Sequence, residues 1–323
     1  LLKIKMYKLP KIITNLILST LLLLSIGVYS QEEKLYRARV LLDSKIPANI
    51  ELARLCVDSL VLDSVTKDDF ISWTLRSFIY FDIYKRTEKN KLNSDLRDTI
   101  ISSILKSNRL NPDETYAGNN KKLLQNIGAG YFNLAKKMLE DSINEEKSLI
   151  AFNRFKEIYK ILEPDINFKQ KDIEYNLTIG SIFSEIFIKD NNNTKAQNTA
   201  KVALLKVIEL DPGNESANIN LGLMYYNQAV NLSKELDYGA DFTQIDFIQE
   251  NMIKLAKQSE QFIFKVYSKN NKNVRSVEAL FYLYRMLLDE PKSDEFKKIA
   301  IELGVKFGDD SPAKDEKINE EKK

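Results

Sequence analysis

The chain has 323 residues, of which 44% are hydrophobic and 29% are charged. This composition indicates a globular protein with ample apolar material, and it excludes an intrinsically disordered chain. There is no histidine and only one cysteine, Cys56, which we interpret as a small core residue. The sequence therefore excludes an intrachain disulfide, histidine-ligated metals and any nucleophile–histidine catalytic pair. We expect no metal and no cofactor.

The start of the chain has the pattern of an export signal. Lys8 and Lys11 precede an apolar run over residues 12–28, and Val28-Tyr29-Ser30 places small residues at the positions before Gln31 where cleavage would occur. The sequence thus predicts cleavage after residue 30.

We interpret residues 1–30 as a signal peptide, with residues 1–5 as an upstream extension before Met6. The apolar run is also just long enough to span a bilayer, so an uncleaved anchor is the alternative. Cleavage would leave no stable membrane span and would place the mature chain in the periplasm, at the cell surface or outside the cell. The composition, rich in Lys, Asn and Ile, resembles that of secreted proteins of Bacteroidota.

The overall charge gives no sign of a nucleic-acid partner. The formal net charge is +2, but four of the 48 basic residues lie within residues 1–30, which leaves 44 against 46 acidic residues. Nucleic-acid-binding proteins usually show a basic patch or stripe. We therefore expect no nucleic acid among the partners.

A five-residue phrase recurs along the chain, with an aliphatic residue, a glycine, two variable residues and an aromatic residue. Its copies are Ile127-Gly128-x-x-Tyr131, Ile179-Gly180-x-x-Phe183 and Leu221-Gly222-x-x-Tyr225, and a copy without the glycine is Leu280-Phe281-x-x-Tyr284. Each copy lies in a run with helical periodicity. A repeated helical phrase predicts stacked helical hairpins, and we expect these residues to form the joints between hairpins.

Residues 31–308 are expected to form about six hairpins, and residues 309–323 a charged, disordered tail. The expected helix pairs are 32–44 with 48–63, split at Pro47; 69–86 with 93–108; 120–141 with 144–162; 170–189 with 195–210; 215–236 with 246–268; and 274–288 with 293–305.

One stretch resembles a known family. It consists of Ala200-x-x-x-Leu204-x-x-Val207, the turn at Pro212 and the phrase from Leu221 to Tyr225. Together these residues resemble a tetratricopeptide repeat. The pair Trp73 and Tyr80 resembles the aromatic opening of another such repeat. The resemblance implies an all-α, right-handed superhelical solenoid of antiparallel helix pairs. The copies of the phrase lie farther apart than the roughly 34 residues of a regular repeat, so the solenoid is expected to be irregular.

The resemblance also implies a binding groove. In this family the first helix of each hairpin lines a concave face, and positions next to the phrase point into it. Carried over residue by residue, the partner-binding candidates are Phe78, Phe81, Phe132, Asn133, Glu185, Tyr226, Asn227, Tyr282 and Arg285. Asn126 and Asn220 match amide positions that some members use to hold a peptide carboxylate, but the basic residues that accompany them do not recur in register.

These observations favour a non-enzymatic scaffold of the bacterial envelope that binds a protein or peptide partner on its concave face. A surface protein that binds a glycan or nutrient is the alternative, because exposed aromatics beside polar groups also suit saccharides. An envelope enzyme that uses carboxylates alone is the third hypothesis, and it would need two carboxyl groups facing each other across a cleft.

Overall fold

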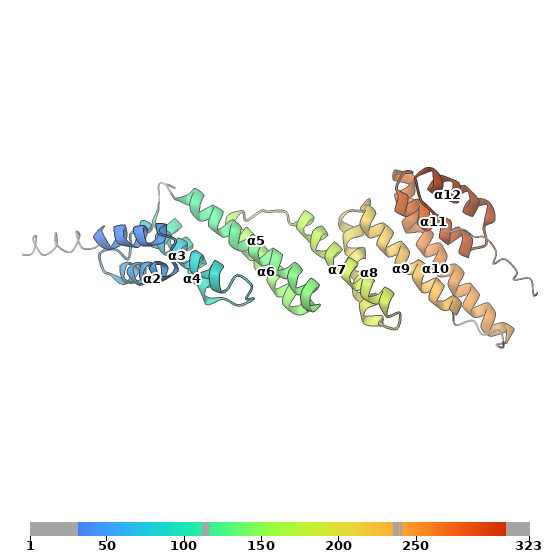
Figure 1. Ribbon diagram of the computed structural model, residues 1–323, viewed down its shortest axis with the longest axis horizontal. Coiled ribbons are helices and arrows are strands. Elements are labelled where there is room, and N and C mark those ends of the chain that lie inside the picture. Colours follow the sequence, from blue (N-terminus) through green and yellow to red (C-terminus); the bar gives the residue numbers. More distant parts are fainter. Residues whose placement is uncertain (1–31, 112–115, 235–238, 240, 308–323) are drawn as a thin grey trace, which may run out of the picture. The chain divides into compact units, whose positions relative to one another are not determined.

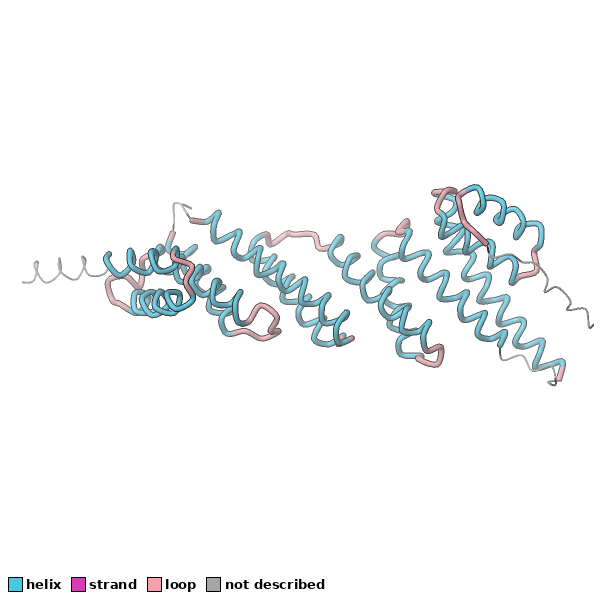
Figure 2. Tube along the Cα trace, in the orientation of Figure 1, coloured by secondary structure: helices cyan, strands magenta, loops and turns pink. Residues whose placement is uncertain are grey.

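The computed structural model describes residues 32–111, 116–234, 239 and 241–307, and the regular elements in these ranges are all α-helices (Figures 1 and 2). The chain divides into two compact units, Leu1–Ile166 and Asn167–Lys323. Within each unit, consecutive helices pack side by side as antiparallel pairs. The predicted all-α repeat architecture is thus confirmed. The predicted signal peptide and the predicted tail lie outside the described residues.

The first unit contains five labelled helices after a helix over residues 32–43. They are α2 (Pro47–Leu62), α3 (Phe70–Thr87), α4 (Asp95–Leu110), α5 (Ala117–Ser142) and α6 (Glu145–Leu162). The bounds follow the predicted ones to within a few residues. Pro47 differs from the prediction, since it is the first residue of α2 rather than a break before it. A proline fits this position because the first helical N–H has no partner within the helix.

The second unit contains α7 to α12. Their bounds are α7 (Lys169–Lys189), α8 (Thr194–Leu210), α9 (Glu215–Lys234), α10 (Phe242–Lys269), α11 (Val274–Met286) and α12 (Glu290–Glu302). The pairs are α7 with α8, α9 with α10, and α11 with α12. Phe242 to Ile245, which were expected to belong to a loop, form the first turn of α10, and Asp241 caps it by accepting from the N–H of Gln244.

Three loops of this unit share one four-residue turn. It opens with Asp or Asn and ends with Asn, at residues 190–193, 211–214 and 270–273. In each turn the last backbone N–H donates to the first carbonyl at 3.0 Å. The closing asparagine then caps the next helix: Asn193, Asn214 and Asn273 accept from the N–H of Ala196, Ala217 and Ser276. The sequence therefore sets both the end of one helix and the start of the next.

The repeated glycines lie where the two helices of one hairpin touch. If a Cβ atom were added to each glycine, it would lie too close to a side chain of the partner helix. The distance would be 2.6 Å from Gly128 to Tyr159, 2.6 Å from Gly180 to Leu204 and 2.5 Å from Gly222 to Ile263. Those three contacts belong to α6, α8 and α10, the partner helices of α5, α7 and α9. The glycines are therefore joints inside hairpins, which corrects the expectation that they join one hairpin to the next.

The aromatic residues of the phrase do reach the preceding hairpin. The ring of Tyr131 lies 4.0 Å from the guanidinium carbon of Arg97 on α4, and the hydroxyl of Tyr284 donates to Glu260 on α10 at 2.6 Å. These rings are buried, as are Phe183 and Tyr225. Most of the small and aliphatic repeat residues are fully buried, namely Ile127, Leu221, Leu280 and Ala200. Ile179 is partly exposed. Tyr225 and Tyr284 also stack on rings of their own partner helices, Phe262 on α10 and Phe296 on α12. The aromatic thus contacts both its own hairpin and the preceding one.

Replacement of Gly222 by alanine tests the closeness of α9 and α10. The new methyl group would lie 2.5 Å from Ile263 and 3.2 Å from the carbonyl oxygen of Ser259, so backbone as well as side chain must move. We expect Gly222→Ala to lower the free energy of unfolding by about 1–3 kcal/mol. Gly118→Ala is the control: nothing lies within 4 Å of its Cβ position, and alanine favours the helix, so stability should stay equal or rise. Thermal melts followed by circular dichroism would decide, and equal melting temperatures for the two variants would contradict the packing.

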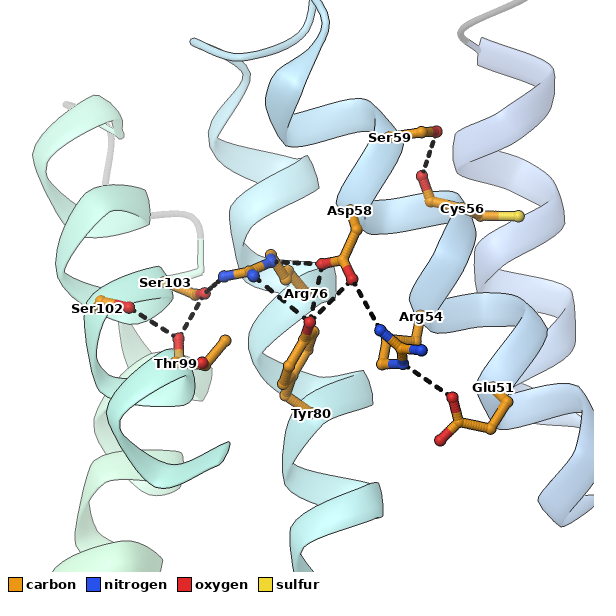
Figure 3. A network of polar contacts seen from close by, with 10 residues as sticks. All are labelled: Glu51, Arg54, Cys56, Asp58, Ser59, Arg76, Tyr80, Thr99, Ser102 and Ser103. Atoms are coloured by element: carbon orange, nitrogen blue, oxygen red, sulfur yellow. Dashed lines mark hydrogen bonds and ion pairs between the residues drawn. The ribbon is translucent and has the colours of Figure 1, made fainter. Parts of the chain in front are cut away.

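A polar network joins the first two hairpins of the first unit (Figure 3). Asp58 on α2 accepts from Nε of Arg76 at 2.9 Å and from the hydroxyl of Tyr80 at 2.8 Å. Nη1 of Arg76 continues to Oγ of Ser103 on α4 at 2.9 Å. Burial and the Asp58 carboxylate raise the pKa of Tyr80, which holds its proton for this bond. The aromatic pair Trp73 and Tyr80 therefore has a structural role, with Trp73 donating to the Lys67 carbonyl.

Loss of Asp58 should loosen this connection. Asp58→Ala leaves Arg76 and Tyr80 without their shared acceptor in a partly buried place, and we expect a loss of about 2 kcal/mol in the free energy of unfolding. Asp141→Ala is the matched control. Asp141 is exposed and forms an ion pair with Lys137 at 3.8 Å, so its loss should cost under about 0.5 kcal/mol. Urea unfolding monitored by Trp73 fluorescence would compare them. Equal midpoints would show that the network adds no stability.

Candidate functional site

The first unit has two adjoining hollows lined by its first helices, which we call the α3–α5 groove. One hollow, of about 450 Å³, lies among the residue 32–43 helix, α3 and α5, and the other, of about 310 Å³, lies between α3 and α5. Both are lined by Phe81, Lys85 and Asn126. Phe78 lines the first and Asn133 the second, so four residues singled out from the sequence come together here.

A row of amides runs along the groove side of α5. Asn119, Asn126 and Asn133 are seven residues apart, which places them on one face of the helix. No hydrogen bond joins these three side-chain amides to other described residues. Each therefore presents both a donor and an acceptor to a ligand. Lys122 and Lys137 lie on the same face and line the same groove.

The floor of the smaller hollow is built from aromatic residues of α3. The ring of Phe81 stacks on that of Tyr84 with centroids 6.1 Å apart, and Nζ of Lys85 lies 5.0 Å from the Phe81 centroid. The hydroxyl of Tyr84 donates to the carbonyl of Lys89 at 3.3 Å. Burial raises the pKa of Tyr84, so the phenol stays neutral and adds no negative charge to the hollow.

The second unit has its own hollow, of about 290 Å³, lined by α7, α9 and α11. A polar line crosses it: Nη2 of Arg275 donates to Oδ1 of Asn220 at 3.2 Å, and Nδ2 of Asn220 reaches Oγ of Ser181 at 3.4 Å. Glu185 and Leu223 also line it. This α7–α11 groove thus carries one carboxylate and one guanidinium and differs in chemistry from the α3–α5 groove.

Several residues predicted to face a partner lie elsewhere. Phe132 is only 5% exposed and packs against Phe152 and Phe155 of α6, at 5.9 and 5.1 Å between ring centroids. Its assignment to the groove was wrong, because the long α5–α6 hairpin closes over it. Tyr282 is partly exposed but packs against Phe281, with ring centroids 4.8 Å apart.

Three other predicted residues of the second unit are at least partly exposed. Arg285 lines a separate hollow between α11 and α12. Tyr226 and Asn227 are partly exposed, and burial raises the pKa of Tyr226. None of these three lines the α7–α11 groove.

The basic residues of both grooves were missed from the sequence. Lys89 follows the last turn of α3, Lys137 lies six residues after Tyr131, and Arg275 lies in the first turn of α11. A search for basic residues at a fixed distance from each phrase could not find them, because each stands at a different distance. The signal that could have found Lys137 is its four-residue spacing from Asn133 on one face of α5.

The described residues were also compared with the requirements of a metal site and of a membrane-spanning helix. Within the described ranges, no group of three or more Cys, Asp or Glu side chains is arranged to hold a metal ion. None of the helices in those ranges combines the length and the apolar character needed to cross a bilayer. The apolar run over residues 12–28 lies outside the described part of the chain.

No protein-family model and no curated protein matches the chain. Among solved structures it is similar to a monomeric IFIT1 mutant with m7Gppp-AAAA and to one with Gppp-AAAA, each at 14% identity and a TM-score of 0.35 over 84% of this chain. A human IFIT1 dimer with PPP-AAAA matches at 12% identity and a TM-score of 0.23, over 80% of this chain and 69% of that one. The chain spans half the length of the first two. These matches are too distant to place the chain in a family or to assign a ligand.

Proposed function

We propose that this chain is an exported, non-enzymatic, tetratricopeptide-like scaffold of a bacterial envelope, which binds a protein or peptide partner on the side lined by its first helices. The observation that carries the proposal is that the residues lining each groove come from several helices. In each unit the groove described above is lined by first helices of successive hairpins rather than by one helix. A ligand that contacts all of them must be extended, and a peptide segment has that form.

The chemistry of the grooves supports a peptide over a saccharide. Saccharide binding relies on exposed aromatic faces, but Phe132 is buried and the Phe81 ring is engaged by Tyr84 and Lys85. The free amides of Asn119, Asn126 and Asn133 instead match the alternating donors and acceptors of a peptide backbone. We therefore favour a polypeptide partner over the glycan or nutrient alternative.

We assign no catalytic residue to the α3–α5 groove. Its carboxylate on α3, Asp82, forms ion pairs with Lys85 at 3.4 Å and Arg86 at 2.8 Å. Both of these partners lie on α3 itself, and Lys85 also lines the groove. The groove thus has the character of a binding surface, which fits the proposed scaffold.

Position-specific crosslinking in the native cell tests the binding side. A photo-crosslinking residue placed at Asn126 or at Leu223 should capture a defined partner. The same residue at Leu105 on α4 or Val202 on α8, both exposed positions on second helices, should capture none. The readout is the set of adduct bands after irradiation, identified by mass spectrometry. Equal capture from all four positions, or capture from the second helices alone, would contradict the proposal.

Export has a separate test. The pattern in residues 1–30 supports cleavage after Ser30, so the mature protein should begin at Gln31 and be found in the envelope fraction. Intact mass and N-terminal peptide mapping of the protein from its native cell would measure this. Replacing Ser30 and Val28 by bulky, charged residues should block processing and retain the precursor at the membrane. A mature protein that keeps residues 12–28 would favour the anchor instead.

A further inference from the structure

We propose that the smaller hollow of the α3–α5 groove binds an acidic segment of the partner, with Asp or Glu carboxylates held by its lysines. This inference rests on the proposed function and specifies the ligand of that site. The hollow, called here the lysine hollow, is lined by Lys85, Lys89, Lys137, Asn90, Asn126 and Asn133, together with Phe81, Tyr84, Gly130 and Leu134. Three of these residues carry a positive charge and none carries a negative one.

The lysines keep capacity for a ligand. Lys85 and Lys137 make ion pairs at 3.4 and 3.8 Å with Asp82 and Asp141, neither of which lines the hollow, and both lysine side chains are about half exposed. Pairs of this kind contribute little because water competes for both charges. Lys89 is exposed and lies on the loop after α3. A ligand carboxylate can therefore gain from all three ammonium groups without breaking a strong interaction.

A buried cation lies behind the floor of the hollow. Arg97 on α4 is fully buried, and its guanidinium carbon lies 5.2 Å from the ring of Tyr84, a residue of the floor. Nη2 donates to the Leu92 carbonyl at 3.1 Å, while Nε and Nη1 have no hydrogen-bond partner. Because a charge in a low-dielectric interior is weakly screened, Arg97 adds to the positive potential in the hollow.

The amides determine the form of the anionic ligand. Asn126 and Asn133 lie on one face of α5 and are about 10.5 Å apart along the axis, at 1.5 Å per residue. Three residues of an extended chain span about 10 Å. An extended peptide along α5 can therefore meet both amides with its backbone while its acidic side chains reach the lysines.

Nucleic acid fits the hollow less well. Single strands bind where bases stack on open aromatic faces beside a basic groove. Phe81 is the most suitable ring in the hollow, but it stacks on Tyr84 and lies beside the Lys85 ammonium group. The Tyr84 ring is buried. The hollow thus offers charge without a stacking platform, which favours an acidic peptide.

A defined probe tests the proposal on the full chain. Fluorescence anisotropy with a labelled hexaglutamate peptide, amidated at its C-terminus, should show saturable binding that weakens as NaCl rises from 20 to 300 mM. Hexaglutamine should bind at least tenfold more weakly. The amidated end separates side-chain recognition from recognition of a terminal carboxylate, and binding that requires a free C-terminus would overturn the proposal.

Matched variants locate the site. One triple variant removes the three lysines of the hollow, with Lys85→Gln, Lys89→Gln and Lys137→Gln. It should weaken hexaglutamate binding at least tenfold without altering the circular dichroism spectrum. The control combines Lys206→Gln, Lys254→Gln and Lys265→Gln, which remove the same charge from exposed positions of α8 and α10, and should change affinity less than twofold. Equal losses in both triple variants would overturn the proposal.

Two further outcomes separate the hypotheses. Tighter binding of a hexauridine RNA than of hexaglutamate, lost in the hollow variant, would assign the hollow to nucleic acid and overturn the inference. If no probe binds but crosslinking at Asn126 still captures a partner, the acidic-segment inference fails while the proposed scaffold function stands.

Discussion

The close approach of two helices at a glycine is the constraint on which each long hairpin depends. At Gly128, Gly180 and Gly222 the partner helix occupies the space that a Cβ atom would need. At 100° per residue, the aromatic residue three positions later is turned by about 60° from the glycine. The glycine thus sets one face of the first helix against its partner helix, and the aromatic buries the adjacent face against both its own hairpin and the preceding one. The remaining face is left for solvent or a ligand.

The same geometry explains which residues line the grooves. Two residues before each glycine and five residues after it are turned by about 160° and 140°, nearly opposite the glycine. On α5 these are Asn126 and Asn133, and both line the groove. On α9 the residue two before Gly222 is Asn220, and on α7 the residue five after Gly180 is Glu185, and both line the α7–α11 groove. The matching positions Thr178 on α7 and Asn227 on α9 do not line that groove. Helix periodicity and one packing contact therefore define the face, while the neighbouring helices decide which of its residues line the hollow.

Much of the fold could be predicted because its signals are local. Helical periodicity and the turn at Asp211–Asn214 each act within a few residues, so the helix bounds followed from the sequence to within a few residues. The site was harder, because a groove residue depends on helix length and on the neighbour. Phe132 stands next to Tyr131 as predicted, yet the α6 phenylalanines cover it. Lys89 lies on a loop, where no periodicity indicates which way a side chain faces.

The packing constraint also explains why a repeat resemblance says little about a ligand. Glycine and aromatic pack against neighbouring helices inside the protein, and the opposite face of the first helix takes no part in those contacts. The two units use that face differently: lysines and free amides in the α3–α5 groove, and a Ser181–Asn220–Arg275 line with Glu185 in the α7–α11 groove. A single repetitive ligand would require similar chemistry in both. The resemblance therefore fixes how the first helices pack, while the ligand is decided by the residues on the opposite face.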